Sequence, residues 1–514
     1  MRRILIALAV LLVWPGAAFT ADLMVKVPVD EYQATKKQLD DMQKQLAELE
    51  RKVEQPEAEA FEEEYSDSKL RKLDRDISYI YDTLDQVETD ALLDRISLGA
   101  EVRVRMDNYR VKNHITSTGT PVADERNDGN WSSRFRINMD AEVSESITFA
   151  GRLALYKNWA DSMGSMISSD NNRAHVSDGS TDLKVDRFYI DWTPKFVTPI
   201  SISFGRLPTS DGPPLEFKED SQRQSIYPAL IFDGEPDGIV VTAGLDQYLN
   251  LKNSGLRYFY AKATQYDAEH LSMSHMDTVW MDPYRDTDVQ AVFFETEVPG
   301  LRDSLLVFSY IPATNILMQS PAPVDQSQAI DNLGDITLYG VHFQVPNLFG
   351  SGLDLFASYG ENRNEPSGNT IDFGGTNFGL FSGGLAPLTA DQAPTGTTTG
   401  WAWYTGFRYE LPVNFLNRPK LGFEYNRGNK YWFSFTPGSG DIFNRLATRG
   451  EAFDVYYIQP FNQHLFLRTG YTQINYEATG SGMPFGQPIE YEEDMGLTEE
   501  PEFHNFYILL DSRF

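Results

Sequence analysis

The sequence predicts an all-β transmembrane protein, an antiparallel up-and-down barrel of about 16 strands (about 14–18), preceded by an α-helical coiled-coil segment. Three observations predict this fold. Apolar and polar residues alternate in long runs from Ser97 onward, the connections between the runs alternate in length, and the last run ends in the aromatic residue Phe514. A strand that crosses a bilayer needs about nine to eleven residues, whereas strands of soluble sheets commonly have about five or six.

The alternation is clear in the first of these runs. Apolar residues occupy the even positions from Leu98 to Met106, while Glu101, Arg103 and Arg105 lie between them. A strand between lipid and a polar lumen needs one apolar and one polar face. We therefore expect strands near residues 97–109, 131–143, 147–159, 183–193, 200–206, 237–246, 254–263, 287–298, 303–312, 333–345, 352–363, 400–410, 419–429, 450–459, 463–476 and 504–514.

The connections between these strands predict the topology. Short turns of outer-membrane barrels face the periplasm and long loops face outside, so both termini are expected in the periplasm. Tight links at 144–146, 299–302 and 460–462 interleave with long connections at 160–182, 207–236 and 364–399.

The last strand carries a second membrane signal. Phe506, Ile508 and Leu510 alternate toward Phe514, which resembles the C-terminal signature that the barrel-assembly machinery reads, although Ser512 departs from its usual apolar choice. Aromatic side chains favour the membrane–water boundary. We expect that place for the aromatic residues near strand ends, which are Tyr109, Trp131, Trp159, Trp192, Tyr310, Trp401, Tyr431 and Trp432.

Residues 1–21 are expected to form a secretory signal peptide. Arg2 and Arg3 precede an apolar stretch from Ile4 to Val13, and small residues follow. The stretch is shorter than the roughly twenty residues of a membrane-spanning helix. Cleavage is expected between Ala18 and Ala21; an uncleaved signal anchor is the alternative.

Residues 22–95 are expected to form a periplasmic coiled-coil stalk. Apolar residues recur at alternating spacings of three and four from Tyr32 to Val53 and again from Leu70 to Ala91, on either side of Pro56. The pattern favours a homo-oligomer. Dimer and trimer both fit, and we favour the trimer; a single amphipathic helix lying on a domain is the alternative.

Composition and motifs exclude several function classes. A net charge of −30 is unsuited to nucleic acid, whose phosphates need clustered Lys and Arg. The chain has no cysteine, which excludes thiol catalysis and disulfides. No G-x-S-x-G, H-E-x-x-H or P-loop motif is present, so we expect neither an enzyme nor a cofactor.

One segment resembles a known group of proteins. The run from Phe204 to Pro214, followed by Tyr227 to Leu230 and by Asp233 to Gly238, is similar to a family of uncharacterised porin-like proteins of anaerobic Gram-negative bacteria. The resemblance extends over nearly the whole mature chain, 96–514 forming the barrel. It implies a channel, and the third long loop, 207–236, resembles the loop that narrows the lumen in general porins.

The charged residues of the lumen are the candidate site. Strand parity places seven arginines on the inner face of the first five strands: Arg103, Arg105, Arg134, Arg136, Arg152, Arg187 and Arg206. The loop offers charges that could stand opposite them: Glu216, Lys218, Glu219, Asp220 and Arg223. Charges that face each other across a constriction set ion preference. A loop packed on the outer rim is the alternative.

The last long loop, 477–503, is strongly acidic. Its carboxylates could bind Ca²⁺ or Mg²⁺, or bridge to lipid phosphate through such ions. A solvated acidic loop is the alternative, because the spacing of a calcium loop is missing. The residues concerned are Glu490, Glu492, Glu493 and Asp494.

The sequence thus predicts an outer-membrane channel for passive diffusion of small hydrophilic or charged solutes. Expected partners are outer-membrane lipid, lipopolysaccharide and, through the stalk, peptidoglycan. A structural anchor that tethers the envelope through its coiled coil is the alternative. A barrel that sheathes an electron-transfer partner would be a third, but no haem or thiol motif supports it.

Overall fold

A computed structural model describes residues 95–114, 122–159, 182–196, 198–264, 286–319, 330–384, 396–436, 440–496 and 499–514, with a few isolated positions before residue 95. The signal peptide and nearly all of the predicted coiled coil lie outside these residues. A compact unit of 99–139 and 143–513 contains the barrel. Among the described residues, no helix is long and apolar enough to cross a membrane.

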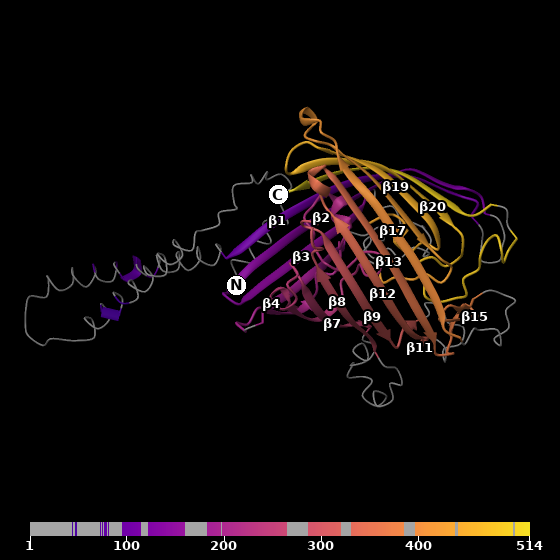
Figure 1. Cartoon of the computed structure of the whole chain (residues 1–514), viewed down its shortest axis with the longest axis horizontal. Coiled ribbons are helices and arrows are strands. Elements are labelled where there is room, and N and C mark those ends of the chain that lie inside the picture. Colours follow the sequence, from indigo (N-terminus) through magenta and orange to yellow (C-terminus); the bar gives the residue numbers. More distant parts are fainter. Residues whose placement is uncertain are drawn as a thin grey trace, which may run out of the picture. The chain divides into compact units, whose positions relative to one another are not determined.

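Sixteen antiparallel strands close into one barrel, which confirms the predicted fold. The strands follow in sequence order, and Figure 1 shows their shared tilt. Their bounds are β1 (Ile96–Lys112), β2 (Glu125–Ser144), β3 (Ile147–Asn158), β4 (Asp182–Trp192), β5 (Ile200–Arg206), β6 (Asp237–Gly244), β7 (Gly255–Thr264), β8 (Thr287–Thr296), β9 (Leu305–Thr314), β12 (Gly334–Val345), β13 (Leu353–Pro366), β17 (Thr398–Glu410), β18 (Lys420–Gly428), β19 (Gly450–Pro460), β20 (Leu465–Tyr476) and β21 (Glu502–Arg513).

The predicted strand ends agree with these bounds to within a few residues. The largest difference is the start of β2, which begins at Glu125 instead of residue 131. The added residues, Glu125 to Asn130, are polar throughout, so no alternation marks them as strand.

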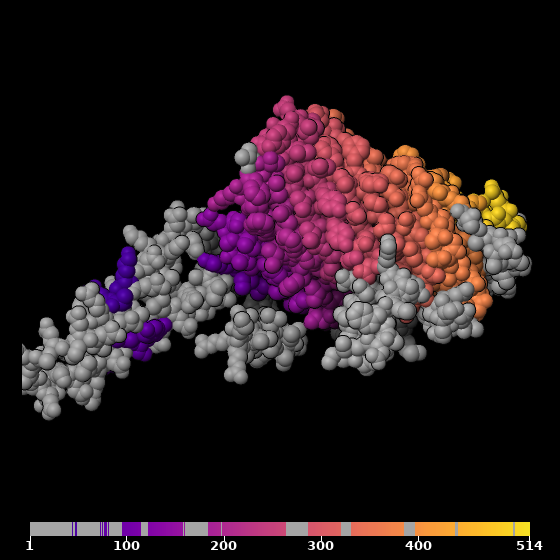
Figure 2. Space-filling view, turned by 90° about the horizontal axis from the view of Figure 1, so that it is seen from below, coloured from indigo at the N-terminus to yellow at the C-terminus, as the bar shows by residue number. Residues whose placement is uncertain are grey.

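The first and last strands pair to close the barrel. Their register runs from Glu101 opposite Arg513 to Lys112 opposite Glu502. Every strand of the barrel therefore has two neighbours, which leaves no open sheet edge in the hydrocarbon. Figure 2 shows one outer face, on which the strands follow each other in sequence order from indigo to orange.

The two faces of the wall differ as strand parity predicts. Arg103 and Arg105 are buried on the inner face of β1, whereas Val102 beside them is exposed on the outer face. The outer face of β21 is likewise apolar, with Phe506 and Leu510 exposed. Apolar side chains on the outside and charges on the inside are the arrangement of a barrel in lipid.

Connections of two kinds define the two ends of the barrel. The turn end carries short connections, among them α5 (Asp246–Leu249), η6 (Leu348–Gly350) and η8 (Asn414–Leu416). The loop end carries the long ones, which include the small sheets β10–β11 (Leu317–Gln319, Ile330–Asn332) and β14–β16 (Ile371–Phe373, Thr376–Gly379, Ser382–Gly383). The connection 207–236 contains α4 (Leu215–Glu219), and 429–449 contains η9 (Arg445–Ala447).

Candidate functional site

The loop 207–236 lies inside the barrel. Its short helix α4 places Phe217 against Phe356 of β13, with ring centroids 6.3 Å apart, and Arg408 of β17 donates to the Phe217 carbonyl at 2.9 Å. At the C-terminal end of the helix, Glu219 contacts Arg103 of β1. Contacts with strands so far apart around the wall require the loop to cross the lumen, which the rim alternative does not explain.

Glu219 and Asp220 form the tip of the loop. Glu219 binds Arg103 and, at 3.0 Å, Arg468 of β20. Asp220 binds Arg408 at 2.9 Å and Lys420 of β18. Burial opposes ionisation of Glu219, but the surrounding arginines hold its pKa well below its usual range. Glu219 is therefore a charged anchor on a basic wall, and Asp220 binds the same wall through Arg408 and Lys420.

Asp211, at the start of the loop, lies in a second cluster of basic side chains. Its carboxylate lies 3.2 Å from Arg136 of β2, 3.4 Å from Arg152 of β3 and 3.8 Å from Arg187 of β4. Burial raises the pKa of Asp211, but the arginines outweigh it and lower that pKa below its usual range. Sequence reasoning did not include Asp211 among the candidate residues, although it lies within the Phe204–Pro214 run.

A second connection, 429–449, also enters the lumen. Asp441 in this segment binds Lys218 of the loop at 3.3 Å and Arg105 of β1 at 3.6 Å. Lys218 also contacts Asp454 of β19 at 3.2 Å, and Arg445 binds Glu424 of β18. The two inserted segments therefore share one network of buried ion pairs with the barrel wall.

Backbone pairing joins the two inserted segments. Phe232 and Phe435 form a parallel bridge. The Asp233 amide donates to the Phe435 carbonyl at 2.8 Å, and the Phe435 amide donates to the Ile231 carbonyl at 3.1 Å. We call these joined segments, 207–236 and the described residues of 429–449, the plug.

Trp432 corrects one expectation. The sequence placed it at the membrane–water boundary, but its side chain is fully buried in the plug, and its indole N–H donates to the Leu446 carbonyl at 2.8 Å. A signal was present: Tyr431 to Phe435 holds four aromatic residues in five, which is unusual for a solvated loop.

Half of the lumen is apolar. Phe259 of β7, Phe293 of β8 and Leu338 of β12 are buried inside the barrel and pack with Ile231 and Trp432 of the plug. The charged half is formed by β17 to β21 and β1 to β4, whose arginines hold the loop carboxylates. The plug thus has one mainly apolar side and one ionic side.

A chain of polar side chains joins the barrel wall to the helix α4. His342 of β12 lies 2.8 Å from Ser358 of β13 and 3.1 Å from Gln344, which donates to Glu216 of α4 at 2.6 Å. Burial raises the pKa of Glu216 above its ordinary value. These contacts fix the helix α4 against β12 and β13, beside the charged strands that begin at β17.

The remaining predicted residues lie elsewhere. Arg134 pairs with Glu101 on the inner wall. Arg206, expected on the inner face, pairs in register with the outward-facing Phe188 and therefore lies on the outer face at the loop end of β5, 3.6 Å from Asp237; Arg223 is exposed. Of the acidic loop, Glu490 binds Lys430 at 3.2 Å. Within the described part of the chain, no group of three His or acidic side chains could hold a metal ion.

These features define a closed sixteen-stranded β-barrel whose lumen is filled by two of its own connections. The chain belongs to the family described as "Protein of unknown function (DUF3373)", whose model matches residues 124–509. No curated protein matches the sequence at a significant level.

Solved structures that align with the chain are outer-membrane proteins at low identity. Pseudomonas putida OprB at high pH is 11% identical, with a TM-score of 0.47, over 83% of this chain and 96% of that chain. Salmonella typhi OmpF in complex with daunomycin is 11% identical, with a TM-score of 0.43, over 82% and 97%. A loop-deletion mutant of OmpT, an outer membrane protein of Vibrio cholerae, is 10% identical, with a TM-score of 0.41, over 82% and 100%. Because these TM-scores are below 0.5, the barrel is assigned from the strand pairing of this chain alone.

Proposed function

We propose that this protein is an outer-membrane channel for passive diffusion of small charged solutes, and that solutes pass along the charged half of its lumen. One observation carries the proposal. Three carboxylates of the loop, Asp211, Glu219 and Asp220, face basic side chains of eight wall strands: Arg103, Arg136, Arg152, Arg187, Arg408, Lys420, Arg468 and Arg513.

The apolar half of the same lumen provides an internal contrast. Buried ion pairs have a large desolvation cost and are often replaceable by apolar residues without loss of stability. Strands β7, β8 and β9 fill their side of the lumen with residues such as Phe259, Phe293 and Val307. A barrel that served only as an anchor could fill both halves in this way. The ionic half is therefore better explained by a polar path.

The surface of the barrel supports the outer membrane as its location. Large apolar side chains such as Phe188, Phe407 and Leu421 are exposed on the outer face. Trp131 and Trp159 stack with centroids 5.0 Å apart near the loop end, as aromatic residues do at the headgroup level. In this location the turn end faces the periplasm and the loop end faces outside.

Single-channel recording tests the proposal. The plug fills much of the lumen, and we propose that ions pass where the loop carboxylates meet the basic wall, so we expect discrete steps of much lower conductance than an unobstructed sixteen-stranded barrel would give. A folded, heat-modifiable protein that produced no steps in planar bilayers would overturn the channel. The anchor alternative depends on the stalk, which lies outside the described residues, and no contact within the described part of the barrel favours it.

A further inference from the structure

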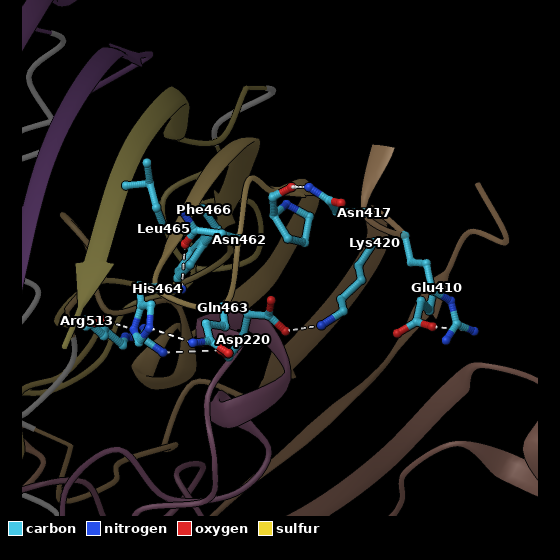
Figure 3. A pocket seen from close by; sticks show the side chains of 12 residues that line it. Asp220, Glu410, Asn417, Lys420, Asn462, Gln463, His464, Leu465, Phe466 and Arg513 are labelled. Carbon is cyan, nitrogen blue, oxygen red and sulfur yellow. Dashed lines mark hydrogen bonds and ion pairs between the residues drawn. The ribbon is translucent and has the colours of Figure 1, made fainter. Parts of the chain in front are cut away.

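The turn end of the barrel contains a cavity of about 420 Å³. Residues of the β17–β18 turn, the β19–β20 turn and the end of β21 line it, and Asp220 at the tip of the loop closes its inner side. Figure 3 shows Lys420 and Arg513 on either side of Asp220. The volume lies in the range of small-molecule sites, about 300–1,000 Å³.

Three basic side chains line this cavity: Arg418, Lys420 and Arg513. The acidic residues of the described lining are Asp220 and Glu410. Among these five residues, cations exceed anions by one. Asn462 and Gln463 add amide groups that can donate to the oxygens of a bound solute, whereas the Asn417 amide already donates to the carbonyls of Pro460 and Phe461.

The basic groups keep capacity for a further anion. Arg418 binds Glu410 at 2.7 Å and its side chain is still 58% exposed. Arg513 uses one guanidinium edge on Asp511, at 2.8 Å, and its terminal nitrogens donate to the main-chain carbonyls of Glu219 and Asp220. Arg513 also lies 3.9 Å from a carboxylate oxygen of Glu219, so Arg418 is the cation of the three whose charge is most exposed at the cavity wall.

Asp220 occupies the site as an internal carboxylate. Its side chain binds Lys420 from the cavity side and Arg408 from the lumen side. An incoming carboxylate or phosphate would meet the same ammonium group with the same geometry. Lys420 is an inward-facing residue of β18, as its neighbour Leu421 is exposed on the outer face. The cavity thus faces the lumen and not the lipid.

We propose that this cavity is a binding site for small soluble anions that carry carboxylate or phosphate groups, with Lys420, Arg418 and Arg513 as the binding cations. The inference deepens the proposed function, because it names the solute class that the turn-end mouth of the channel receives. Its test measures binding and requires no conduction, so the two can fail separately.

Calorimetric titration of the full-length protein in octyl glucoside, a detergent without phosphate, tests the site. The probes are sodium succinate and sodium phosphate, with choline chloride as the cation control. Lys420→Gln and Asp220→Asn remove the same ion pair and loosen the loop tip alike. They differ in the charge left behind, so they separate electrostatics from structural damage.

We expect both anions to bind the wild type and choline not to bind. Lys420→Gln should weaken succinate binding at least tenfold, because it removes a charge-assisted hydrogen bond. Asp220→Asn should tighten binding severalfold, because the competing carboxylate is gone. Arg302→Gln, at an exposed turn position outside the lining, is the matched control and should bind as the wild type does.

Three results would overturn the site: no heat with either anion, equal loss in both ion-pair variants, or equal loss in Arg302→Gln. Detergent micelles that contain phosphatidylglycerol, as a third probe, separate the sources of phosphate. If this lipid alone bound, the cavity would be a lipid headgroup site and the soluble-anion assignment would be wrong. Anion binding by a protein that gives no conductance would keep the site and overturn only the channel.

Discussion

Gly340 and Gly360 lie directly opposite each other on β12 and β13, and together they leave the inner wall bare where the plug rests. A Cβ atom on Gly340 would overlap the Ile231 side chain, and one on Gly360 would lie 2.6 Å from the Trp432 ring. Neither position could accept a side chain without movement. The paired glycines therefore leave the space in which both inserted segments pack against the wall. We call this space the seat of the plug.

Filling this seat should loosen the plug. We expect Gly360→Val to lower the free energy of unfolding by about 1–3 kcal/mol, as overpacking of a dense core does, and to raise the single-channel conductance. Urea unfolding and planar-bilayer recordings would measure the two effects. Gly396→Val is the control, because a Cβ there meets nothing within 4 Å. Equal behaviour of the two variants would show that the seat has no role.

An engineered disulfide should report the loop inside the lumen. The chain has no cysteine, so Ile231→Cys with Gly340→Cys would introduce a single pair. A Cβ atom added to Gly340 would lie 3.5 Å from Cγ1 and 3.6 Å from Cγ2 of Ile231. The Ile231 Cβ is bonded to both Cγ atoms, so the two Cβ positions are near enough to test a disulfide, whose Cβ atoms lie about 3.5–4.5 Å apart.

We expect this pair to oxidise almost fully in isolated outer membranes, seen as a gel-mobility shift that a reductant reverses. Pairing Gly340→Cys with Ser221→Cys, near the loop tip, should give little cross-link. Failure of the first pair to oxidise, or equal oxidation of both pairs, would place the loop elsewhere.

The plug should weaken as pH rises. Burial, with repulsion from Asp211, raises the pKa of Asp233 to about 8, and burial raises that of Glu235 to about 7. In the unfolded chain both carboxyls ionise near pH 4. Between about pH 4 and pH 8 the folded state therefore holds more protons than the unfolded state, and stability falls as pH rises.

Asn has nearly the shape of a protonated Asp side chain but does not ionise. Asp233→Asn therefore removes the titration of this group. We expect this variant to be more stable than the wild type at pH 8, and to show a shallower loss of stability between pH 5 and pH 8. Urea midpoints at several pH values would measure this. A variant whose pH dependence matched the wild type would show that Asp233 ionises normally in the fold.

How far the sequence predicts this structure depends on which face of a strand is considered. The outer face is largely apolar, so a two-residue period locates all sixteen strands, and only the polar start of β2 escapes it. The inner face is apolar where it packs against apolar side chains of the plug, and charged where it pairs with the carboxylates of the plug. In β9, Leu305 to Phe308 is apolar on both faces, and this loss of alternation is explained by the plug that packs against the strand.

The site was predicted in part for the same reason. Parity predicted Arg103 and Arg136 on the inner wall, and the loop position indicated Glu219 and Asp220 as counterparts of the basic wall. In the structure Glu219 contacts Arg103 and Asp220 contacts Arg408, whereas Arg136 binds Asp211. Contacts between connections that are far apart in the sequence produce no periodic pattern from which they could be predicted. The pairing of Phe232 with Phe435 and the role of Asp441 therefore appear only in three dimensions.

The charged seam between the loop and the basic wall is the central element of the proposed channel. Glu219→Gln tests it most directly, because it removes one carboxylate from that seam and leaves Arg103 and Arg468 in excess. The measurement is the reversal potential of single channels under a KCl gradient, with Glu145→Gln, an exposed turn residue, as the control. We expect Glu219→Gln to shift the reversal potential toward that of chloride and Glu145→Gln to leave it unchanged. A folded Glu219→Gln channel with the reversal potential of the wild type would contradict this role of the seam, because ions would then pass along a different path.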